Sequence, residues 1–162
     1  IEYSDIFCVM RIGDDLGFKT NTLLPPTDII EYIIPKYKRI INMIHLNKKP
    51  FLLHSCGNIF SIMEALIDAG IDAKHSNEDE IAPMKIWYER YGDRLGNFGG
   101  IDADILCRYS KQEIIDYVTN VFHKASNHGG VALGSGNSIP DYIPTDNYIT
   151  MMETLSKLRQ TK

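Results

Sequence analysis

The sequence predicts an α/β fold in which short buried strands alternate with amphipathic helices. Three observations support this prediction. Apolar runs of strand length recur along the chain, segments with helical spacing separate them, and each run ends in a loop rich in polar residues or glycine. This alternation is typical of parallel βα units. The 162 residues are 44% hydrophobic and 23% charged, as expected for one globular domain over residues 1–162.

Five strands are expected from the apolar runs. They cover residues 7–12, 51–53, 71–74, 95–98 and 131–133. An open doubly wound sheet and part of a (β/α)8 barrel both accommodate this order of elements. In either architecture ligands bind at the carboxyl ends of the strands, so the loops that follow the strands are the first place to look for a site.

The helices are expected between these strands. The first begins at Thr27 or Asp28, either of which can cap it, and Pro35 predicts a kink or restart. A second helix ends at Gly70, the residue type favoured just after a helix end. A third covers residues 80–91, and Ser110 with Glu113 forms a capping box at the start of the fourth. The last helix starts near residue 144 and is expected to bury Tyr148, Ile149, Met152 and Leu155.

The segment FLLHSCGN, residues 51–58, carries the most specific polar pair. Residues i and i+2 of a strand point to the same face, so His54 and Cys56 are expected side by side. An imidazole and a thiolate at this distance can form half of a zinc site or an activated thiol. The alternative is a buried thiol beside a hydrogen-bonded histidine. Candidates for a third ligand are His75, Glu78, Asp102 and Cys107.

Other strand ends carry carboxylates. Asp14 and Asp15 follow the first strand and can offer a carboxylate to a substrate or a metal, although an aspartate in such a loop also favours a turn. Asp102, in GGID, is expected to point into the same pocket. Glu78 lies in an acidic run that is otherwise interpreted as a solvated helix start. The loop GSGNS, residues 134–138, resembles a phosphate- or carboxylate-binding loop without the lysine of a P-loop.

Seven segments, in this order, resemble the C-terminal half of the uroporphyrinogen decarboxylase superfamily. They are GDDLG, HSCGN, AGIDAKHSNEDEI, YGDRL, GGIDADIL, GSGNSIP and PTDNYITMM. The superfamily also contains cobalamin-dependent methyltransferases that transfer methyl groups to thiols such as coenzyme M. Its fold is a (β/α)8 barrel of roughly twice this length. The resemblance therefore implies that the chain is a fragment, the C-terminal part of a TIM barrel with about five βα units.

The methyltransferase branch has a His-x-Cys pair at this strand end and a cysteine in the last-strand loop, which together bind zinc and activate the acceptor thiol. The resemblance implies that His54 and Cys56 bind a metal, with a corrinoid or methylcobalamin as the methyl-carrying substrate. Ser135 stands at the loop position of the third ligand, so His75 or Cys107 is expected to replace it. The decarboxylase branch has a loop that resembles GHG at this position, and the matching histidine is absent.

The leading hypothesis is a fragment of an enzyme of this superfamily, nearer the methyltransferase branch. In this hypothesis the catalytic residues are Asp15, Glu78 and Asp102, and the substrate-binding residues are Asp14, Ser135 and Asn137. The alternatives are uroporphyrinogen decarboxylation and a non-catalytic, self-associating module. We expect the longer parent protein to be the active enzyme and the isolated chain to be inactive.

Bulk properties exclude several other classes. The net charge is −4 with acidic and basic residues interspersed, which argues against nucleic-acid binding. No apolar run approaches the roughly 18 residues that span a membrane. Three widely separated cysteines argue against a disulfide scaffold and favour the reducing cytoplasm. Strand edges and apolar faces exposed in a partial barrel predict a homo-oligomer.

Overall fold

The computed structural model describes residues 5–160. Within this range the chain divides into two compact units. The first comprises the described residues up to His75 together with Arg94–Gly96, and the second comprises Ser76–Asp93 and the described residues from Asn97 onward. Both units combine parallel strands with helices, which confirms the predicted α/β class. In the described part of the chain no helix is long and apolar enough to cross a membrane.

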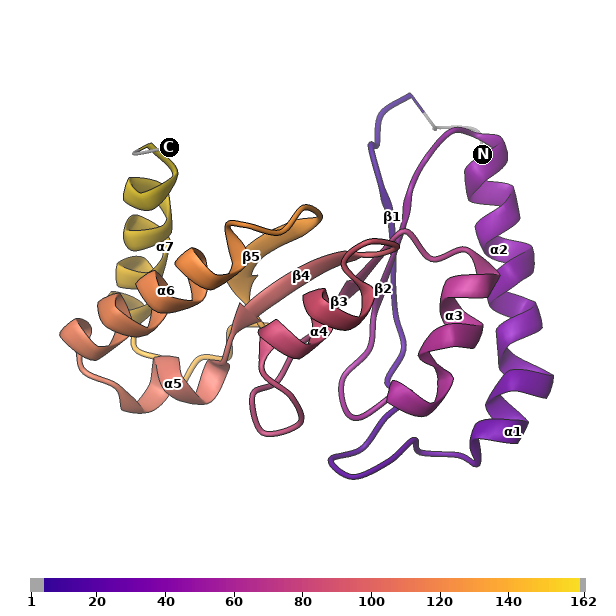
Figure 1. The fold of residues 1–162 in the computed structure, drawn as a ribbon, viewed down its shortest axis with the longest axis horizontal. Coiled ribbons are helices and arrows are strands. Elements are labelled where there is room, and N and C mark those ends of the chain that lie inside the picture. Colours follow the sequence, from indigo (N-terminus) through magenta and orange to yellow (C-terminus); the bar gives the residue numbers. More distant parts are fainter. Residues whose placement is uncertain (1–4, 161–162) are drawn as a thin grey trace. The chain divides into compact units, whose positions relative to one another are not determined.

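The first unit contains three parallel strands with β2 in the middle (Figure 1). Its elements are β1 (Met10–Gly13), α1 (Pro26–Asp28), η1 (Ile29–Ile33), α2 (Ile34–Leu46), β2 (Phe51–His54), η2 (Phe60–Ile62), α3 (Met63–Ala69) and β3 (Ala73–His75). Gly13 lies opposite His54, which in turn lies opposite His75. The carboxyl ends of the three strands therefore meet at one edge of this sheet.

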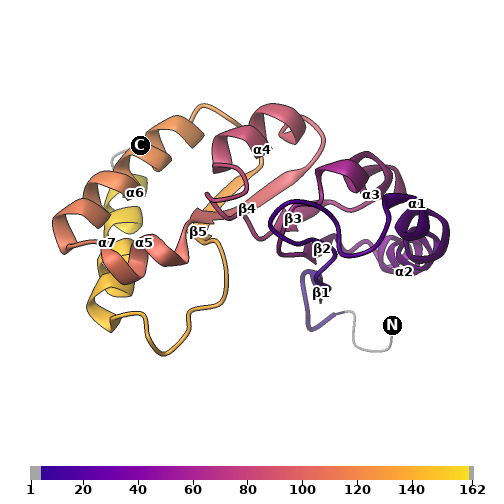
Figure 2. The ribbon, with the colours of Figure 1, turned by 90° about the horizontal axis from the view of Figure 1, so that it is seen from below.

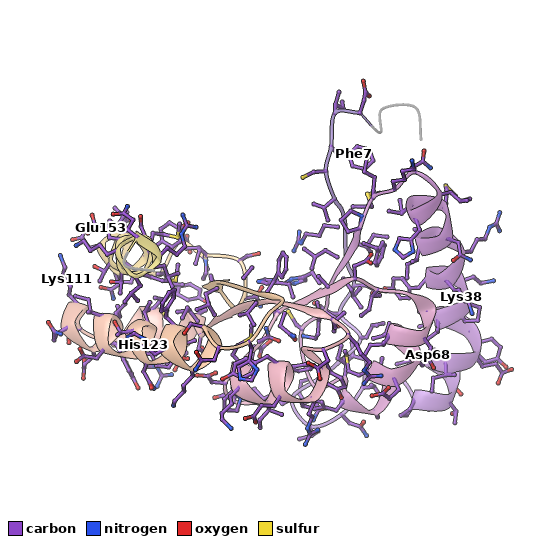
Figure 3. The ribbon with its side chains drawn as sticks, turned by 45° about the horizontal axis from the view of Figure 1, so that its top comes forward. Phe7, Lys38, Asp68, Lys111, His123 and Glu153 are labelled. Atoms are coloured by element: carbon purple, nitrogen blue, oxygen red, sulfur yellow. The ribbon has the colours of Figure 1, made fainter. Side chains whose placement is uncertain are left out.

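The core of the first unit lies between β2 and the helices. Phe51 and Leu53 of β2 are fully buried, as are Ile41 of α2 and Leu66 of α3. The two helices lie side by side on one face of the strands (Figures 1 and 2). Lys38 and Asp68, on the outer faces of these helices, point away from the unit (Figure 3). The buried helix faces thus hold the strands in place, and with them the loops at the strand ends.

The second unit has two parallel strands. Its elements are α4 (Met84–Tyr91), β4 (Gly96–Ile101), α5 (Ala103–Arg108), α6 (Lys111–Ala125), β5 (Val131–Ser135) and α7 (Thr145–Gln160). Helices α6 and α7 pack together (Figure 2). The predicted capping box of Ser110 and Glu113 is present at the start of α6. The core cluster consists of Ile101, Leu106, Ile114, Val118, Ile143, Met151 and Leu155.

The first helix begins differently from the prediction. Neither Thr27 nor Asp28 caps it, because the helix already starts at Pro26, and no side chain bonds to its first amides. The predicted restart at Pro35 is confirmed. Pro35 occupies the second position of α2. The turn before it, η1, is a π-helix, in which backbone hydrogen bonds join residues five apart instead of four. A proline ring clashes with the carbonyl four residues earlier in a regular helix, so the widened turn relieves this clash.

The starts of β1 and α4 also differ from the predicted boundaries, the first because of strand pairing and the second because of a proline. Strand β1 runs over Met10–Gly13 rather than residues 7–12, because its ladder with β2 starts where Met10 meets Phe51. Helix α4 begins at Met84 rather than at residue 80. Pro83 disfavours helical backbone for the residue before it, so the helix cannot start before the proline, which is its N-cap residue. Gly70 ends α3 in the left-handed conformation, as predicted.

The prediction of which side chains α7 buries is partly wrong. Ile149 and Met152 are 45% and 48% exposed, whereas Thr150, Met151 and Thr154 are buried. The two threonines look polar in the sequence. However, each hydroxyl donates to the carbonyl four residues earlier at 2.7 Å, so it is satisfied within the helix and can face the core.

Candidate functional site

The carboxyl ends of β1 and β2 bring the loops that follow them into contact. Because Gly13 pairs with His54, the residues just beyond these positions continue side by side. The amide of Asp14 donates to the carbonyl oxygen of His54 at 2.9 Å. One residue further, the amide of Cys56 donates to Asp15 Oδ1 at 3.2 Å. Asp15 therefore lies directly beside the His-x-Cys segment.

Asp15, His54 and Cys56 form a cluster of potential metal ligands. One ligand atom from each residue lies within 4.8 Å of the others. Cys56 Sγ is 3.6 Å from His54 Nε2, which confirms that the two side chains share a face. His54 is 9% exposed, Cys56 is half-buried and Asp15 is exposed, so the cluster opens toward solvent at the carboxylate. Within the described residues this is the one such cluster of histidine, cysteine and carboxylate side chains.

The donor set of this cluster suits zinc. Histidine nitrogen, cysteine thiolate and carboxylate oxygen are its usual protein ligands, and three of them leave a fourth tetrahedral position open. Bonds of about 2.0–2.3 Å to one ion place ligand atoms roughly 3.3–3.8 Å apart. The His54–Cys56 separation of 3.6 Å already lies in this range, and the ligand atom of Asp15 lies within 4.8 Å of both.

His75 forms a hydrogen bond with the His54 ring nitrogen that does not face Cys56. Their Nδ1 atoms are 2.6 Å apart and their rings are stacked, with centroids separated by 4.9 Å. A hydrogen bond between two Nδ1 atoms requires a proton on one of them. When His54 carries it, Nε2 keeps its lone pair and faces Cys56, which is the tautomer that binds a metal. In this arrangement His75 orients His54 from the side opposite Cys56.

The environment of His54 favours the neutral imidazole. Burial lowers its pKa most, and the neighbouring His75 lowers it further. The positive charges of Arg11 and Lys74 act in the same direction, whereas the carboxylate of Asp15 partly opposes them. A histidine that is neutral at pH 7 is ready to bind a metal without losing a proton first.

The second predicted carboxylate of this loop points elsewhere. Asp14 Oδ2 accepts a hydrogen bond of 2.5 Å from the hydroxyl of Tyr37, a residue of α2 that is 5% exposed. Burial, followed by this bond to the carboxylate, raises the pKa of Tyr37 above its usual range. Asp14 thus anchors α2 to the end of β1, and its role in substrate binding stays a prediction.

Two predicted catalytic carboxylates lie in the second unit. Asp102 caps α5, because its Oδ1 accepts the amide of Asp104 at 2.7 Å. Its Oδ2 accepts the amide of Asp79 at 2.9 Å. Glu78 is half-buried, and its carbonyl oxygen accepts amides from the turn that follows. Asp102 therefore stabilises the start of α5 and the turn around Asp79. The catalytic roles of Asp102 and Glu78 stay predictions.

Sequence reasoning missed the position of Asp79. Asp79 follows Glu78 in the acidic run that was interpreted as a solvated helix start, yet its carboxylate is half-buried and accepts a hydrogen bond from the hydroxyl of Tyr117 on α6. Burial raises the pKa of Asp79, although the bond from Tyr117 opposes the shift. Tyr117 stands 38 residues away along the chain, and no local pattern connects the two positions.

The loop after β5 is closed by its own hydrogen bonds. Ser135 Oγ donates to the carbonyl of Asn137 at 2.5 Å, and the amide of Ser138 donates to Asn137 Oδ1 at 2.8 Å. The amide of Gly136 donates to the carbonyl of Ile101 at 2.6 Å. These bonds use groups that were expected to hold an anion, and the substrate-binding role of Ser135 and Asn137 stays a prediction. Cys107, a predicted third ligand, packs half-buried against the apolar cluster of the second unit.

Comparison with known proteins identifies the family. The family model described as "Uroporphyrinogen decarboxylase (URO-D)" matches residues 8–158. The chain belongs to this family. It is 24% identical over 143 residues to a uroporphyrinogen decarboxylase of Geobacter sulfurreducens, an alignment that covers 85% of this chain and 39% of that protein.

A solved structure supports the fold of this URO-D family member. The chain is similar to a methyltransferase from Methanosarcina mazei, with a TM-score of 0.75 and 18% sequence identity. The alignment covers 94% of this chain and 42% of the methyltransferase. The chain thus spans about two fifths of the relatives it matches. This likeness confirms the predicted fold, part of a barrel of the uroporphyrinogen decarboxylase superfamily.

Proposed function

We propose that this chain carries the metal-binding part of a URO-D family enzyme that transfers a methyl group from a corrinoid to a thiol. The observation that supports this proposal is the convergence of Asp15, His54 and Cys56 within 4.8 Å. The half-buried thiol lies beside a hydrogen-bonded imidazole whose pKa is lowered, chiefly by burial, and an exposed carboxylate leaves the cluster open to solvent. The neighbour from Methanosarcina mazei is itself named a methyltransferase.

Each residue of the cluster has a defined task in this proposal. Cys56 binds as the thiolate, His54 binds through the lone pair of Nε2, and Asp15 binds through a carboxylate oxygen. His75 keeps the proton of His54 on Nδ1. Zinc, when bound, lowers the pKa of a substrate thiol at its fourth position. The thiol sulfur then supplies the electron pair of the new S–C bond, the thiol proton leaves to solvent, and the pair of the Co–C bond stays on cobalt.

Metal content tests this proposal. The 162-residue chain, purified without added metal and then titrated with Zn²⁺, is expected to bind close to one equivalent. Cys56→Ala is expected to remove this binding, whereas Cys8→Ala, the matched change at an exposed cysteine, is expected to leave it intact. Less than about 0.2 equivalents in the wild type, unchanged in Cys56→Ala, would contradict the metal role.

The third ligand is decided by the same titration. In the proposed set it is Asp15, so Asp15→Ala is expected to weaken binding while Cys107→Ala leaves it unchanged. A loss in Cys107→Ala would instead favour Cys107, one of the two residues expected to replace the ligand that is missing at Ser135. Since Cys107 packs against the apolar cluster of its own unit, its substitution also reports on the stability of that unit.

Decarboxylation of uroporphyrinogen is a second candidate function. It is favoured by the relative from Geobacter sulfurreducens, which carries this name. In this alternative the cleft binds the acidic side chains of a tetrapyrrole. Incubation of a longer protein that contains this chain with uroporphyrinogen, followed by measurement of coproporphyrinogen, distinguishes the two functions. Formation of product at normal rates in Cys56→Ala would favour decarboxylation over thiol methylation.

We also propose that the chain self-associates, as partial barrels with open edges are expected to do. The second unit has an apolar groove of about 610 Å³ between β5, α6 and α7, with Phe122, Leu133 and Met152 in its walls. An apolar surface of this kind favours association in water. Light scattering is expected to show a dimer or larger assembly, and a clean monomer would contradict this proposal. Self-association without metal binding or catalysis would leave only the third candidate, a non-catalytic module.

A further inference from the structure

We infer that Ser55 is a positioning residue that holds Asp15 in place as a metal ligand. This inference rests on the proposed function, because it concerns the third ligand of the same site. Ser55 stands between His54 and Cys56, yet its side chain points away from both. It is fully buried, and its hydroxyl lies at the contact between the loop after β2 and the loop after β1.

Ser55 fixes the backbone immediately after Asp15. Its Oγ accepts the amide of Leu16 at 3.1 Å, a bond that spans 39 residues of sequence. Its own amide donates to the carbonyl of His75 at 2.7 Å, so the serine is itself tied to β3. Leu16 is 4% exposed and cannot move without opening buried surface. Ser55 thus links the loop of Asp15, through its hydroxyl, to the strand that carries His75, through its backbone amide.

The backbone immediately before Asp15 is fixed as well. The amide of Asp14 bonds to the carbonyl of His54, and the carboxylate of Asp14 accepts from Tyr37. Asp15 therefore stands between two anchored neighbours, Asp14 and Leu16. The backbone of such a segment keeps Asp15 close to His54 and Cys56, so only its side chain has to adjust when a metal binds, and this is a form of preorganisation.

A close crossing of two glycines completes the anchor. A Cβ added to Gly17 would lie 2.7 Å from the carbonyl carbon of Gly57 and 2.8 Å from the amide nitrogen of Asn58. Gly57 has a φ of 79°, and a Cβ there would overlap the backbone of Gly17. At the crossing the amide of Asn58 donates to the carbonyl of Phe18 at 2.6 Å. Both loops can approach this closely only because neither residue has a side chain.

The inference predicts a coupling between Ser55 and Asp15 that a merely structural serine would lack. Ser55→Ala leaves all three ligands in the chain but removes the acceptor of the Leu16 amide. With Co²⁺ alone as the probe, followed through its thiolate absorption, the affinity is expected to fall 10- to 100-fold. Ser61→Ala, the matched change at an exposed serine of the same unit, is expected to leave the affinity within twofold.

The decisive measurement is the same substitution in a chain that already lacks the carboxylate. In Asp15→Ala, the further change Ser55→Ala is expected to alter Co²⁺ affinity by less than twofold, since the residue that Ser55 positions is gone. An equal loss in both backgrounds, or no loss in either, would overturn the positioning role. If Ser55→Ala does not fold, Gly17→Ala opens the same crossing from the other loop and is expected to give the same pattern.

Amide hydrogen exchange in the metal-free protein separates this inference from the proposed function. The amides of Leu16 and Asn58 are expected to be protected in the wild type, and Leu16 is expected to lose protection in Ser55→Ala. A wild type that binds no metal would overturn the proposed function, and the metal role of Ser55 with it. A wild type that binds metal but leaves the Leu16 amide unprotected would overturn only the positioning by Ser55.

Discussion

The strand ends of the two units carry similar residues and use them differently. In the first unit, Asp15, His54 and Cys56 direct ligand atoms toward one point. In the second, both carboxylate oxygens of Asp102 accept backbone amides, and Asp79 accepts from Tyr117. A carboxylate after a strand is therefore no evidence of chemistry by itself. The two cases differ in what surrounds the carboxylate. Both oxygens of Asp102 accept backbone amides, whereas Asp15 accepts one such amide and lies beside an imidazole and a thiol.

The largest effect expected from this comparison is a difference between Cys56→Ala and Asp102→Ala. Cys56→Ala is expected to lower Zn²⁺ affinity by more than the roughly 100-fold that outer-shell losses reach, because a direct ligand is removed. Asp102→Ala is expected to leave the affinity unchanged and to lower the free energy of unfolding by about 1–2 kcal/mol, because a helix cap is lost. Zinc competition titrations and urea unfolding measure the two quantities. Reversed results would contradict the assignment of the two units.

The next effect concerns His75, the hydrogen-bond partner of His54. His75→Ala is expected to lower Zn²⁺ affinity by roughly 10- to 100-fold, because His54 loses the partner that holds its Nδ1 proton. His75→Asn is the matched variant, since the Asn Oδ1 occupies about the place of the histidine Nδ1 and can accept the same proton. It is expected to recover most of the affinity. Equal losses in both variants would show that His75 acts by packing rather than by its hydrogen bond.

A smaller effect is expected from the hydrogen bond in the second unit. Tyr117→Phe removes the hydroxyl that donates to Asp79 and leaves a half-buried carboxylate without this partner. The free energy of unfolding is expected to fall by about 1–3 kcal/mol, with no change in Zn²⁺ affinity. Tyr148→Phe on α7 is a control that also removes one tyrosine hydroxyl. A loss of metal affinity in Tyr117→Phe would mean that the second unit also serves the metal site.

The smallest effect is a pH dependence at Asp79. Burial raises the pKa of this carboxyl above its value in the unfolded chain, so the folded protein binds its proton more readily. Relative to Asp79→Asn, the wild type should therefore gain stability as the pH falls from 7 through the raised pKa toward about 4. Urea unfolding at both pH values measures this difference. A wild type that loses stability relative to Asp79→Asn over this range would contradict the predicted direction.

The fold could be predicted from the sequence because its signals are local. The capping box of Ser110 and Glu113 and the left-handed Gly70 each depend on a few neighbouring residues. The alternation of strands and helices likewise needs only short windows of sequence. Features that depend on long-range pairing could not be predicted. The bonds of Tyr37 to Asp14 and of Tyr117 to Asp79 join residues 23 and 38 positions apart.

The candidate site lies between these extremes. The alternation of side chains along a strand sufficed to place His54 and Cys56 on one face. The approach of Asp15 depends on the register of β1 against β2 and on the crossing of Gly17 with Gly57, which no single segment reveals. The sequence indicated Asp15 as a useful carboxylate, whereas its place beside the thiol and the contribution of Ser55 emerged only from the structure.

X-ray absorption of the zinc-loaded chain tests the central claim most directly, because it counts sulfur and lighter ligands around the ion. The proposed set of Asp15, His54 and Cys56 predicts one sulfur at about 2.3 Å and the remaining nitrogen and oxygen ligands at about 2.0–2.2 Å. In Cys56→Ala the sulfur shell is expected to disappear. Two or more sulfurs in the wild type, or a coordination shell without any sulfur, would contradict the site.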